Sequence, residues 1–562
     1  MQAVHTGGVV RLPLLDEYLV AQQQMTAVER FSRLHETHAL AENERVYRDL
    51  IPLDRPKPGQ QYAFQVDLDA CTGCKACVTA CHSMNGLDQA EAETWRSVGL
   101  LQGGSPGAAV QQTVTTACHH CIDPACMHGC PVNAYEKDPV TGIVRHLDDQ
   151  CIGCQYCTLT CPYEVPQFNK RLGIVRKCDM CSGRLEAGEA PACVQACPNE
   201  AISIRIVETA AVLEEAQADD FLPGAPSPGI TAPTTSYVSK RPLPRNMLPA
   251  DFYRVRPGSE HTPLVLMLVL TQWSVGAFAV EFALRRMPGL AFPSQSRPLH
   301  AIMAVVVGLL ALSASTAHLG RPLYAMRALI GLRTSWLSRE ILLFGLFAGL
   351  AVAYAGLTWW LAWPPRAWDA AVMALPWLAA CVSATGLLGV ACSVMLYHAT
   401  KKELWSVSRT AFRFFATTAL LGMASTVATA ATGAPGALAA SAPGARALAL
   451  ALAGLGACKV LWELGMVAHL RDKRLTELKR TAVLLTGELR PLFAWRVVLG
   501  VVFGVLCPWL TARAWALPTV DKSAVLAGGA LGVAGIAVAE LLERMLFFRA
   551  VCVPRMPGHW GR

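Results

Sequence analysis

The sequence predicts a cysteine-rich α+β domain followed by an all-α polytopic membrane bundle of about eight transmembrane helices. Two observations predict this division. Sixteen of the 21 cysteines lie between Cys71 and Cys197, whereas long apolar runs begin only after about residue 262. Charged residues make up 16 % of the 562-residue chain and apolar residues 53 %, a balance typical of membrane proteins. The expected domains are an N-terminal arm at 1–65, the cysteine domain at 66–205, a linker at 206–260 and the membrane bundle at 261–562.

The N-terminal arm is expected to contain one helix, from about Asp16 to Leu50, because apolar residues recur at helical spacing in TAVERFSRLHETHALAENERVYRDL. The opening stretch MQAVHTGGVVRLPLLDEYLVAQQQ shows neither the basic region, apolar core and cleavage site of a secretory signal nor a twin arginine. We therefore expect the cysteine domain to face the cytoplasm. Thiols stay reduced in that compartment, which favours metal binding over disulfides.

The sixteen cysteines fall into four groups of four. In the first group, CTGCKACVTAC, four cysteines occupy eleven positions. The groups are Cys71, Cys74, Cys77 and Cys81; Cys118, Cys121, Cys126 and Cys130; Cys151, Cys154, Cys157 and Cys161; and Cys178, Cys181, Cys193 and Cys197. A cubane cluster has four iron corners and a short loop presents thiolates to only three, so the fourth ligand comes from elsewhere in the chain.

Zinc is the alternative metal for these thiolate ligands. Structural zinc sites take two pairs of ligands across a longer spacer and do not require three cysteines within about seven residues. A proline follows Cys130, Cys161 and Cys197, as in bacterial ferredoxins, whereas His82 follows Cys81. The spacing therefore favours [4Fe-4S] clusters, which carry electrons, over zinc, which does not.

Residues 66 to about 205, including ETWRSVG after the first group, resemble the four-cluster ferredoxin subunit of the dimethyl sulfoxide reductase family of molybdoenzymes. The resemblance implies a ferredoxin-like fold in which the first and fourth groups, and the second and third, exchange their last cysteines. Cys154 stands where some relatives carry Trp and a [3Fe-4S] cluster, so four [4Fe-4S] clusters are implied. The implied ligand sets are set 1 (Cys71, Cys74, Cys77, Cys197), set 2 (Cys178, Cys181, Cys193, Cys81), set 3 (Cys118, Cys121, Cys126, Cys161) and set 4 (Cys151, Cys154, Cys157, Cys130).

The linker at 206–260 is expected to be extended, because FLPGAPSPGITAPTTS is rich in Pro, Gly, Ser and Thr. We expect it to pack along its own cysteine domain or a partner. From residue 262 onward, apolar runs approach the roughly 20 residues that cross a bilayer. Eight spans are expected to start at about Thr262, Leu299, Ile341, Ala370, Ala411, Ala445, Phe493 and Ser523.

Charge bias orients this bundle. Loops on the side of the cysteine domain carry fourteen Lys and Arg residues, and the opposite loops carry seven. The positive-inside rule then places the cysteine domain at the cytoplasmic face of a bacterial inner membrane. Topology also accounts for the formal charge of +8, and without a basic-aromatic cluster no nucleic-acid partner is expected.

The membrane half resembles the eight-helix anchor of the same reductase family. The motifs that carry the resemblance are HTPLVLMLVLTQWSVGAF, AHLGRPLYAMRAL, SREI, FAWRVVLG and AELLERMLFF. Family anchors exchange electrons with quinol or quinone without haem, near the face that meets the clusters, and His318 and Glu340 occupy the matching positions. Quinol oxidation releases two protons with two electrons, so an imidazole and a carboxylate suit this site. The structural alternatives are a histidine that reaches interfacial water and a glutamate at a helix start.

Other ionisable residues of the bundle are interpreted as structural or have no assigned role. Lys459 with Glu463, and Glu540 with Arg544, stand four apart and are expected to neutralise each other. Glu281 has no evident local partner. His318, His398 and His469 near helix ends leave axial haem ligation open, although the family resemblance argues against haem.

The hypothesis for the whole chain is an electron-transfer and anchor subunit between the quinone pool and a separate molybdopterin catalytic subunit, with quinone redox as the only chemistry of its own. Its cytoplasmic orientation and covalent fusion favour sulfite oxidation to quinone, as in membrane-bound sulfite dehydrogenase. The alternative is a quinol-dependent reductase of dimethyl sulfoxide or a related S- or N-oxide. An alternative of another class is a passive membrane anchor with no quinone site.

Overall fold

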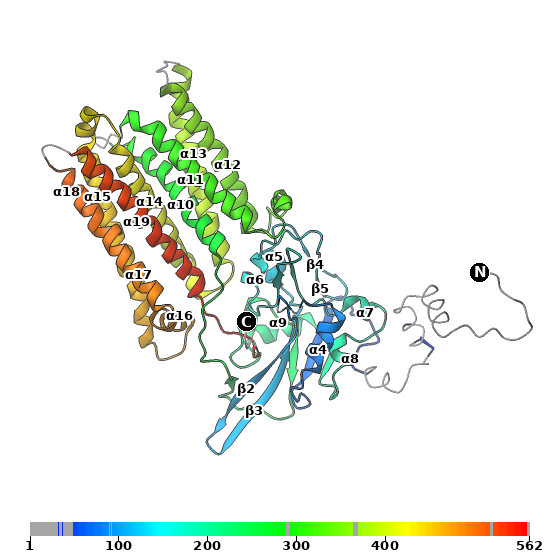
Figure 1. Ribbon diagram of the computed structural model, residues 1–562. Helices are drawn as coiled ribbons and strands as arrows, with labels where there is room; N and C mark the ends of the chain where they lie inside the picture. Colours follow the sequence, from blue (N-terminus) through cyan, green and yellow to red (C-terminus); the bar gives the residue numbers. More distant parts are fainter. Residues whose placement is uncertain are drawn as a thin grey trace, which may run out of the picture.

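The structure, a computed structural model, describes residues 49–558 apart from 89, 92, 288–292, 363–368 and 518–520, together with residues 32, 36 and 37. The helix expected from about Asp16 to Leu50 lies almost wholly outside the described residues. A domain of short strands and helices stands at one end of a bundle of long helices (Figure 1). The chain is therefore a ferredoxin-like domain followed by an all-helical region, the predicted fold class.

The ferredoxin-like domain is built on two three-stranded sheets and two short hairpins. In the first sheet the central strand is β1, which pairs antiparallel with β8 from Gln60↔Glu208 to Val66↔Ile202 and parallel with β9. In the second sheet the central strand is β2, between β3 and β10. The strands are β1 Gln60–Asp67, β2 Ser97–Ser105, β3 Ala108–Thr116, β4 Tyr135–Lys137, β5 Val144–His146, β6 Gln167–Asn169, β7 Ile174–Arg176, β8 Ile202–Glu208, β9 Ser236–Val238 and β10 Leu248–Pro249.

Short helices follow the cysteine loops. They are α4 Ala76–Met84, α5 Ala125–His128, α6 Tyr156–Thr160, α7 Ser182–Glu186 and α8 Ala192–Gln195. Cysteines also fill much of the domain core: Cys77, Cys81, Cys118, Cys178 and Cys193 are buried in one cluster with Phe64 and Val66 of β1. Metal ligation in such a domain replaces part of the apolar core that a domain of this size needs.

The linker packs along its own ferredoxin-like domain, one of the two expected places, but it is not simply extended. It contains the helix α9 Thr209–Gln217 and contributes β9 and β10 to the two sheets. Its backbone also bonds the second cysteine group, since Ile122 N donates to Ala232 O at 2.9 Å and Thr234 N to His119 O at 3.2 Å. Two linker segments pair as outer strands of the sheets, and composition alone does not predict this pairing.

Eight helices are long and apolar enough to cross a membrane, which confirms the predicted count for the described residues, and each expected start lies within five residues of the observed one. The chain is a multi-pass membrane protein. The spans are Thr262–Leu284 (α10), Ser294–Ala317 (η2 and α11), Trp336–Ala362 (α12), Asp369–His398 (α13), Val407–Ala430 (α14), Ala440–Arg471 (α15 and η5), Arg490–Ala514 (α17, η6 and α18) and Lys522–Arg549 (α19). A shorter helix, α16 Glu477–Thr486, lies between the sixth and seventh spans.

Small residues let the central helix α10 approach α14 closely. A Cβ atom added at Gly276 would lie 1.9 Å from the carbonyl oxygen of Thr418, and one added at Gly422 would lie 2.3 Å from that of Gly276. Glycine at such contacts is a common way to pack helices in lipid, where apolar burial between helices gives little driving force.

The expected intrahelical charge pairs were wrong. Lys459 forms its ion pair with Glu540 of α19, while Glu463 pairs with Arg496 of α17 at 2.9 Å. Arg496 also contacts Glu540 at 3.0 Å, and Arg544 contacts Glu543 at 3.5 Å. These side chains face the bundle interior, where Lys459, Glu463 and Glu540 have ion-pair partners on neighbouring helices. We call this group the buried ion cluster: Arg413, Lys459, Glu463, Arg496, Glu540, Glu543 and Arg544.

Glu281 has local partners, contrary to expectation. Arg285, the C-cap residue of α10, donates its Nε to Glu281 Oε1 at 2.7 Å, and Tyr354 Oη donates to Glu281 Oε2 at 3.0 Å. The spacing of four residues between Glu281 and Arg285 was visible in the sequence. These contacts lie at the end of α10 remote from the ferredoxin-like domain, and they give Glu281 a structural role.

Candidate cluster and quinone sites

The structure brings thiols of each implied set close to one another. Electrostatic interactions join Cys77 to Cys197 in set 1 and Cys81 to Cys181 and Cys193 in set 2. In set 3, Cys126 interacts with Cys118, Cys121 and Cys161. In set 4, Cys157 interacts with Cys130, Cys151 and Cys154. Within the described part of the chain, Cys71 and Cys74 show no comparable interaction with the other thiols of set 1.

Interactions between sets give them an order. Cys77 of set 1 lies near Cys193 of set 2, and Cys178 of set 2 lies near Cys118 of set 3. Tyr135 lies near Cys126 of set 3 and Cys157 of set 4. The order is therefore 1, 2, 3, 4. Among the sixteen thiols only Cys74 of set 1 is exposed, so set 1 ends the series at the protein surface.

The residues present fit iron-sulfur clusters. A cavity with about 370 Å³ of empty space is lined by all four thiols of set 3. Backbone N–H groups point at sulfurs in other sets, including Ala134 N to Cys130 Sγ at 3.2 Å and Ala201 N to Cys197 Sγ at 3.3 Å. Such donors stabilise thiolates. Among the described residues, no three His, Cys, Asp or Glu side chains surround one point as a single metal ion requires.

Glycines shape two of the cysteine loops. Gly73 and Gly153 have φ of +74° and +68°, the left-handed conformation that glycine adopts without strain. The residues Lys75 and Gln155 that precede α4 and α6 are also left-handed, at φ of 65° and 60°. Successive turns of this kind direct backbone N–H groups into a concavity, which suits an anionic cluster.

Burial makes several of these cysteines poor thiolates on their own. Burial, strengthened by neighbouring thiols, raises the pKa of Cys81 and Cys154 to about 12, and burial raises that of Cys161 to about 11. Near neutral pH these groups carry protons unless a metal replaces them. Cluster binding and proton release are therefore coupled in this domain.

Sequence reasoning missed two buried cations beside the thiols. Lys177, 3 % exposed, donates to Cys178 O at 2.8 Å and lies 3.6 Å from Cys118 Sγ. Arg96 donates to Thr115 Oγ1 at 3.2 Å, and that hydroxyl lies 3.6 Å from Cys77 Sγ. Both offset negative charge at the sets. Arg96 lies within the quoted ETWRSVG stretch and Lys177 directly precedes a cysteine, which were the available signals.

Set 4 lies against the membrane half. The loop after α11 bonds the loops that carry this set: Arg321 N donates to Ile152 O at 3.0 Å, and Gly331 N to Pro131 O at 2.8 Å. A Cβ added at Gly320 would lie 2.1 Å from the oxygen of Gly173, so the two halves touch through backbone. Leu319 and Ile341 pack on the apolar cluster that contains Cys130, Cys151 and Cys157.

Glu340 lies at this junction. It is 4 % exposed on α12 and accepts a hydrogen bond from Ser393 of α13. Tyr156 of α6 lies between the two halves: it interacts electrostatically with both Glu340 and Cys154, and its hydroxyl donates to Leu396 O at 2.6 Å. A carboxylate, a phenol and the membrane-side end of the thiol series are thus adjacent.

His318 lies at the end of α11 with different neighbours. Its ring packs edge-on to His261, with centroids 6.0 Å apart, and His261 packs on Phe548. Its Nε2 is buried with no hydrogen-bond partner among the described residues. Burial lowers the pKa of His318 and takes that of His261 to about 4. Both imidazoles are therefore neutral near pH 7. His261, which begins the HTPLVLM motif, was missed.

The structure does not bring His318 and Glu340 into contact. The ring of His318 packs on His261, which precedes α10, whereas the partners of Glu340 lie on α13 and in the ferredoxin-like domain. Both nevertheless lie at the end of the bundle that meets the ferredoxin-like domain. Of the other histidines weighed for haem, His469 bonds Asp472 through Nδ1 at 3.0 Å.

Comparison with known proteins matches both halves. A family model described as the DMSO reductase anchor subunit (DmsC) matches residues 255–549, and one described as a 4Fe-4S dicluster domain matches residues 110–206. The B subunit of the anaerobic dimethyl sulfoxide reductase of Haemophilus influenzae is 35% identical over 158 residues, 26% of this sequence and 76% of that protein.

Two further relatives come from other systems. The thiosulfate reductase electron transfer subunit PhsB of Salmonella typhi is 35% identical over 143 residues, 25% of this sequence and 74% of that protein. The hydrogenase-2 operon protein HybA of Escherichia coli O157:H7 is 35% identical over 191 residues, 30% of this sequence. The match spans about half the length of HybA, 55%.

Proposed function

The protein belongs to the DMSO reductase anchor subunit (DmsC) family, and from that premise we propose that it passes electrons between a separate molybdopterin catalytic subunit and membrane quinone. The ordered series of thiol sets, from exposed Cys74 to set 4 beside the membrane half, is the observation that carries the proposal. Four [4Fe-4S] clusters bound there supply one-electron transfer. The catalytic subunit docks at the set 1 end.

The quinone site lies where set 4 meets the bundle. Reduction of a quinone takes up two electrons and two protons, so the site needs groups that exchange protons with the quinone oxygens. His318 offers a neutral imidazole with an unpartnered Nε2, and Glu340 offers a carboxylate held by Ser393. Ser393 positions Glu340 by its hydrogen bond, and burial excludes bulk water from the carboxylate.

Sulfite is the substrate that we propose for the catalytic partner, with electrons flowing to quinone on the cytoplasmic side. The excess of Lys and Arg in and beside the connections on the ferredoxin-like side, fourteen against seven by the sequence count, supports this orientation in a bacterial inner membrane. Cytoplasmic clusters suit oxidation of a substrate generated inside the cell. A quinol-dependent reductase is the second candidate, favoured by relatives whose names specify dimethyl sulfoxide and thiosulfate reductases.

The test uses the purified complex with its catalytic subunit. Sulfite with a quinone analogue is compared with dimethyl sulfoxide, and with thiosulfate, each with a quinol analogue. The proposal expects sulfite-dependent quinone reduction. Activity only with the quinol-coupled substrates would reverse the assigned direction, and an unchanged quinone-coupled rate in His318→Ala would support a passive anchor.

A further inference from the structure

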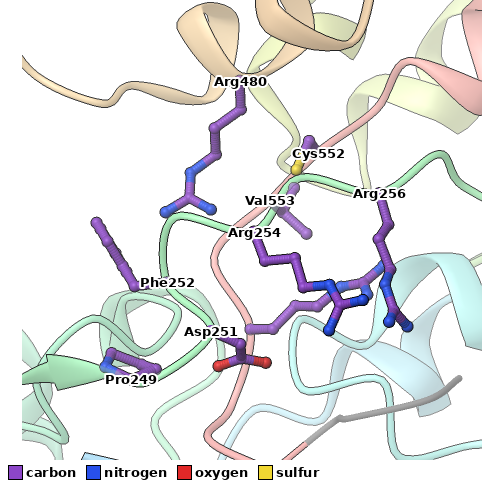
Figure 2. Close-up of a pocket in the computed structure, with 9 residues that line it drawn as sticks. Pro249, Asp251, Phe252, Arg254, Arg256, Arg480, Cys552 and Val553 are labelled. Carbon is purple, nitrogen blue, oxygen red and sulfur yellow. The ribbon is translucent and has the colours of Figure 1, made fainter. Parts of the chain in front are cut away.

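An arginine-rich cavity lies apart from the thiol sets, where the linker, α16 and the C-terminal segment meet. It has about 520 Å³ of empty space. Figure 2 shows Arg480 extending from α16 toward the linker, with Arg254 and Arg256 extending from the linker itself. The lining residues are Pro249, Asp251, Phe252, Arg254, Arg256, Arg480, Cys552, Val553 and Arg555.

The charges around this cavity do not balance. Four guanidinium groups line it, against the single carboxylate of Asp251. Outside the lining, Glu164 pairs with Arg555 at 3.2 Å, and Glu477 interacts electrostatically with Arg480 and Lys402. With these groups included, the surroundings still carry a net positive charge. Positive charge gathered in a partly enclosed space is costly unless an anion offsets it.

Arg480 places an unpartnered polar atom at this cavity. The residue is 4 % exposed, and its Nη2 has no hydrogen-bond partner among the described residues. Its guanidinium carbon lies 4.4 Å from the centre of the Phe252 ring, which fixes the group at the cavity wall. A buried guanidinium nitrogen without a partner costs free energy that a ligand oxygen would recover.

We propose that this cavity binds the phosphate of an anionic phospholipid headgroup. Guanidinium groups match phosphate oxygens through paired, charge-assisted hydrogen bonds. The cavity lies at the headgroup level, because its residues come just before α10, which starts at Thr262, just after α19, which ends at Arg549, and from α16 between two spans. Phe252 and Val553 add apolar surface beside the arginines. Basic pockets at the ends of membrane helices bind such lipids.

The proposal is independent of the quinone site and of the direction of electron flow. A bound lipid would join three segments distant in sequence, and thereby hold the linker and the C-terminal segment against α16. Lipid binding is therefore expected to raise the thermal unfolding midpoint of the protein.

The test uses the full chain with its clusters, delipidated in a neutral detergent. Apparent affinity is measured from the unfolding midpoint and by native mass spectrometry, with phosphatidylglycerol, phosphatidylcholine and inorganic phosphate as separate probes. We expect phosphatidylglycerol to bind best. Arg256→Gln should weaken its binding about fivefold, the effect of about one basic charge at a membrane surface. Arg480→Gln should weaken it further, because it removes the unpartnered Nη2.

The matched control is Lys473→Gln, an exposed cation on the connection before α16 that does not line the cavity. Its affinity should equal that of wild type. Cluster absorbance shows whether each variant is folded. If Arg480→Gln does not fold, Arg256→Gln still tests the proposal. Equal phosphatidylglycerol affinity in wild type and Arg256→Gln overturns the proposal. If the protein binds inorganic phosphate but not lipid, the ligand is a soluble phosphate. If the arginine variants lose only their binding to the catalytic subunit, the cavity is a protein contact. Either result overturns the lipid assignment.

Discussion

At the scale of single residues, the cysteine ligands were predictable and their electrostatic partners were not. Iron clusters demand closely spaced thiolates, so the sequence itself displays groups such as CTGCKACVTAC. Lys177 and His261 act through neighbours distant in sequence, Cys118 and His318. Their roles depend on packing that spacing does not encode.

Protonation of His318 should limit quinone turnover at low pH. Burial lowers the pKa of His318 below the usual 6.5. The imidazole therefore stays neutral as pH falls to 6.5, and it becomes protonated only when the pH falls below the lowered pKa. We expect quinone-coupled turnover to be constant above pH 6.5 and to fall below the lowered pKa. His318→Gln should reduce turnover about a hundredfold, the usual scale of general acid–base catalysis, and abolish this acid limb. An acid limb that survives in His318→Gln would assign the titration to another group.

At the scale of elements, hydropathy located all eight spans because bilayer thickness fixes their length. The contacts between them were not predictable in the same way. Lys459 stands four residues from Glu463 but pairs with Glu540 on α19, because both side chains face the bundle interior. Helical spacing identifies neighbours on the surface of one helix, whereas the residues of the buried ion cluster come from four helices.

Loss of one charge from the buried ion cluster should destabilise the bundle. Lys459 is 0 % exposed, and Lys459→Met leaves Glu540 with Arg496 as its remaining ion-pair partner. Removing one member of a buried pair costs about 3 kcal/mol, so the thermal unfolding midpoint in detergent should fall. Adding Glu540→Gln should recover part of the loss. Cys458→Ala, at the adjacent exposed position, is the control. An equal unfolding midpoint in Lys459→Met and Cys458→Ala would show that the Lys459–Glu540 pair contributes nothing to stability.

At the scale of the whole molecule, the division into two halves followed from composition, but the surface that joins them did not. The junction includes backbone contacts, such as those of Gly320 and Gly331, and glycine leaves no hydropathy signal. The motif AHLGRP nevertheless contained both His318 and Gly320. One short segment therefore supplies a proposed quinone ligand and the contact with set 4.

Gly320→Ala should separate the halves. Its Cβ would lie 2.1 Å from Gly173 O, too close for the present docking, so set 4 must move away from the bundle. We expect slower electron exchange between clusters and quinone, with cluster content unchanged. Gly183→Ala is the control, since a Cβ there has open space. Equal exchange rates in the two variants would mean that this contact does not set the distance between clusters and quinone.

The central claim is that electrons pass from the clusters to quinone within this protein. The most direct measurement reduces the clusters of the purified full chain chemically and follows their reoxidation by electron paramagnetic resonance after a quinone analogue is added. We predict rapid reoxidation in wild type and a rate about a hundredfold lower in His318→Ala, the scale expected for loss of a proton-exchanging group. A soluble oxidant should reoxidise both equally. Equal rates with the quinone analogue in wild type and His318→Ala would contradict the account and leave the membrane half as a passive anchor.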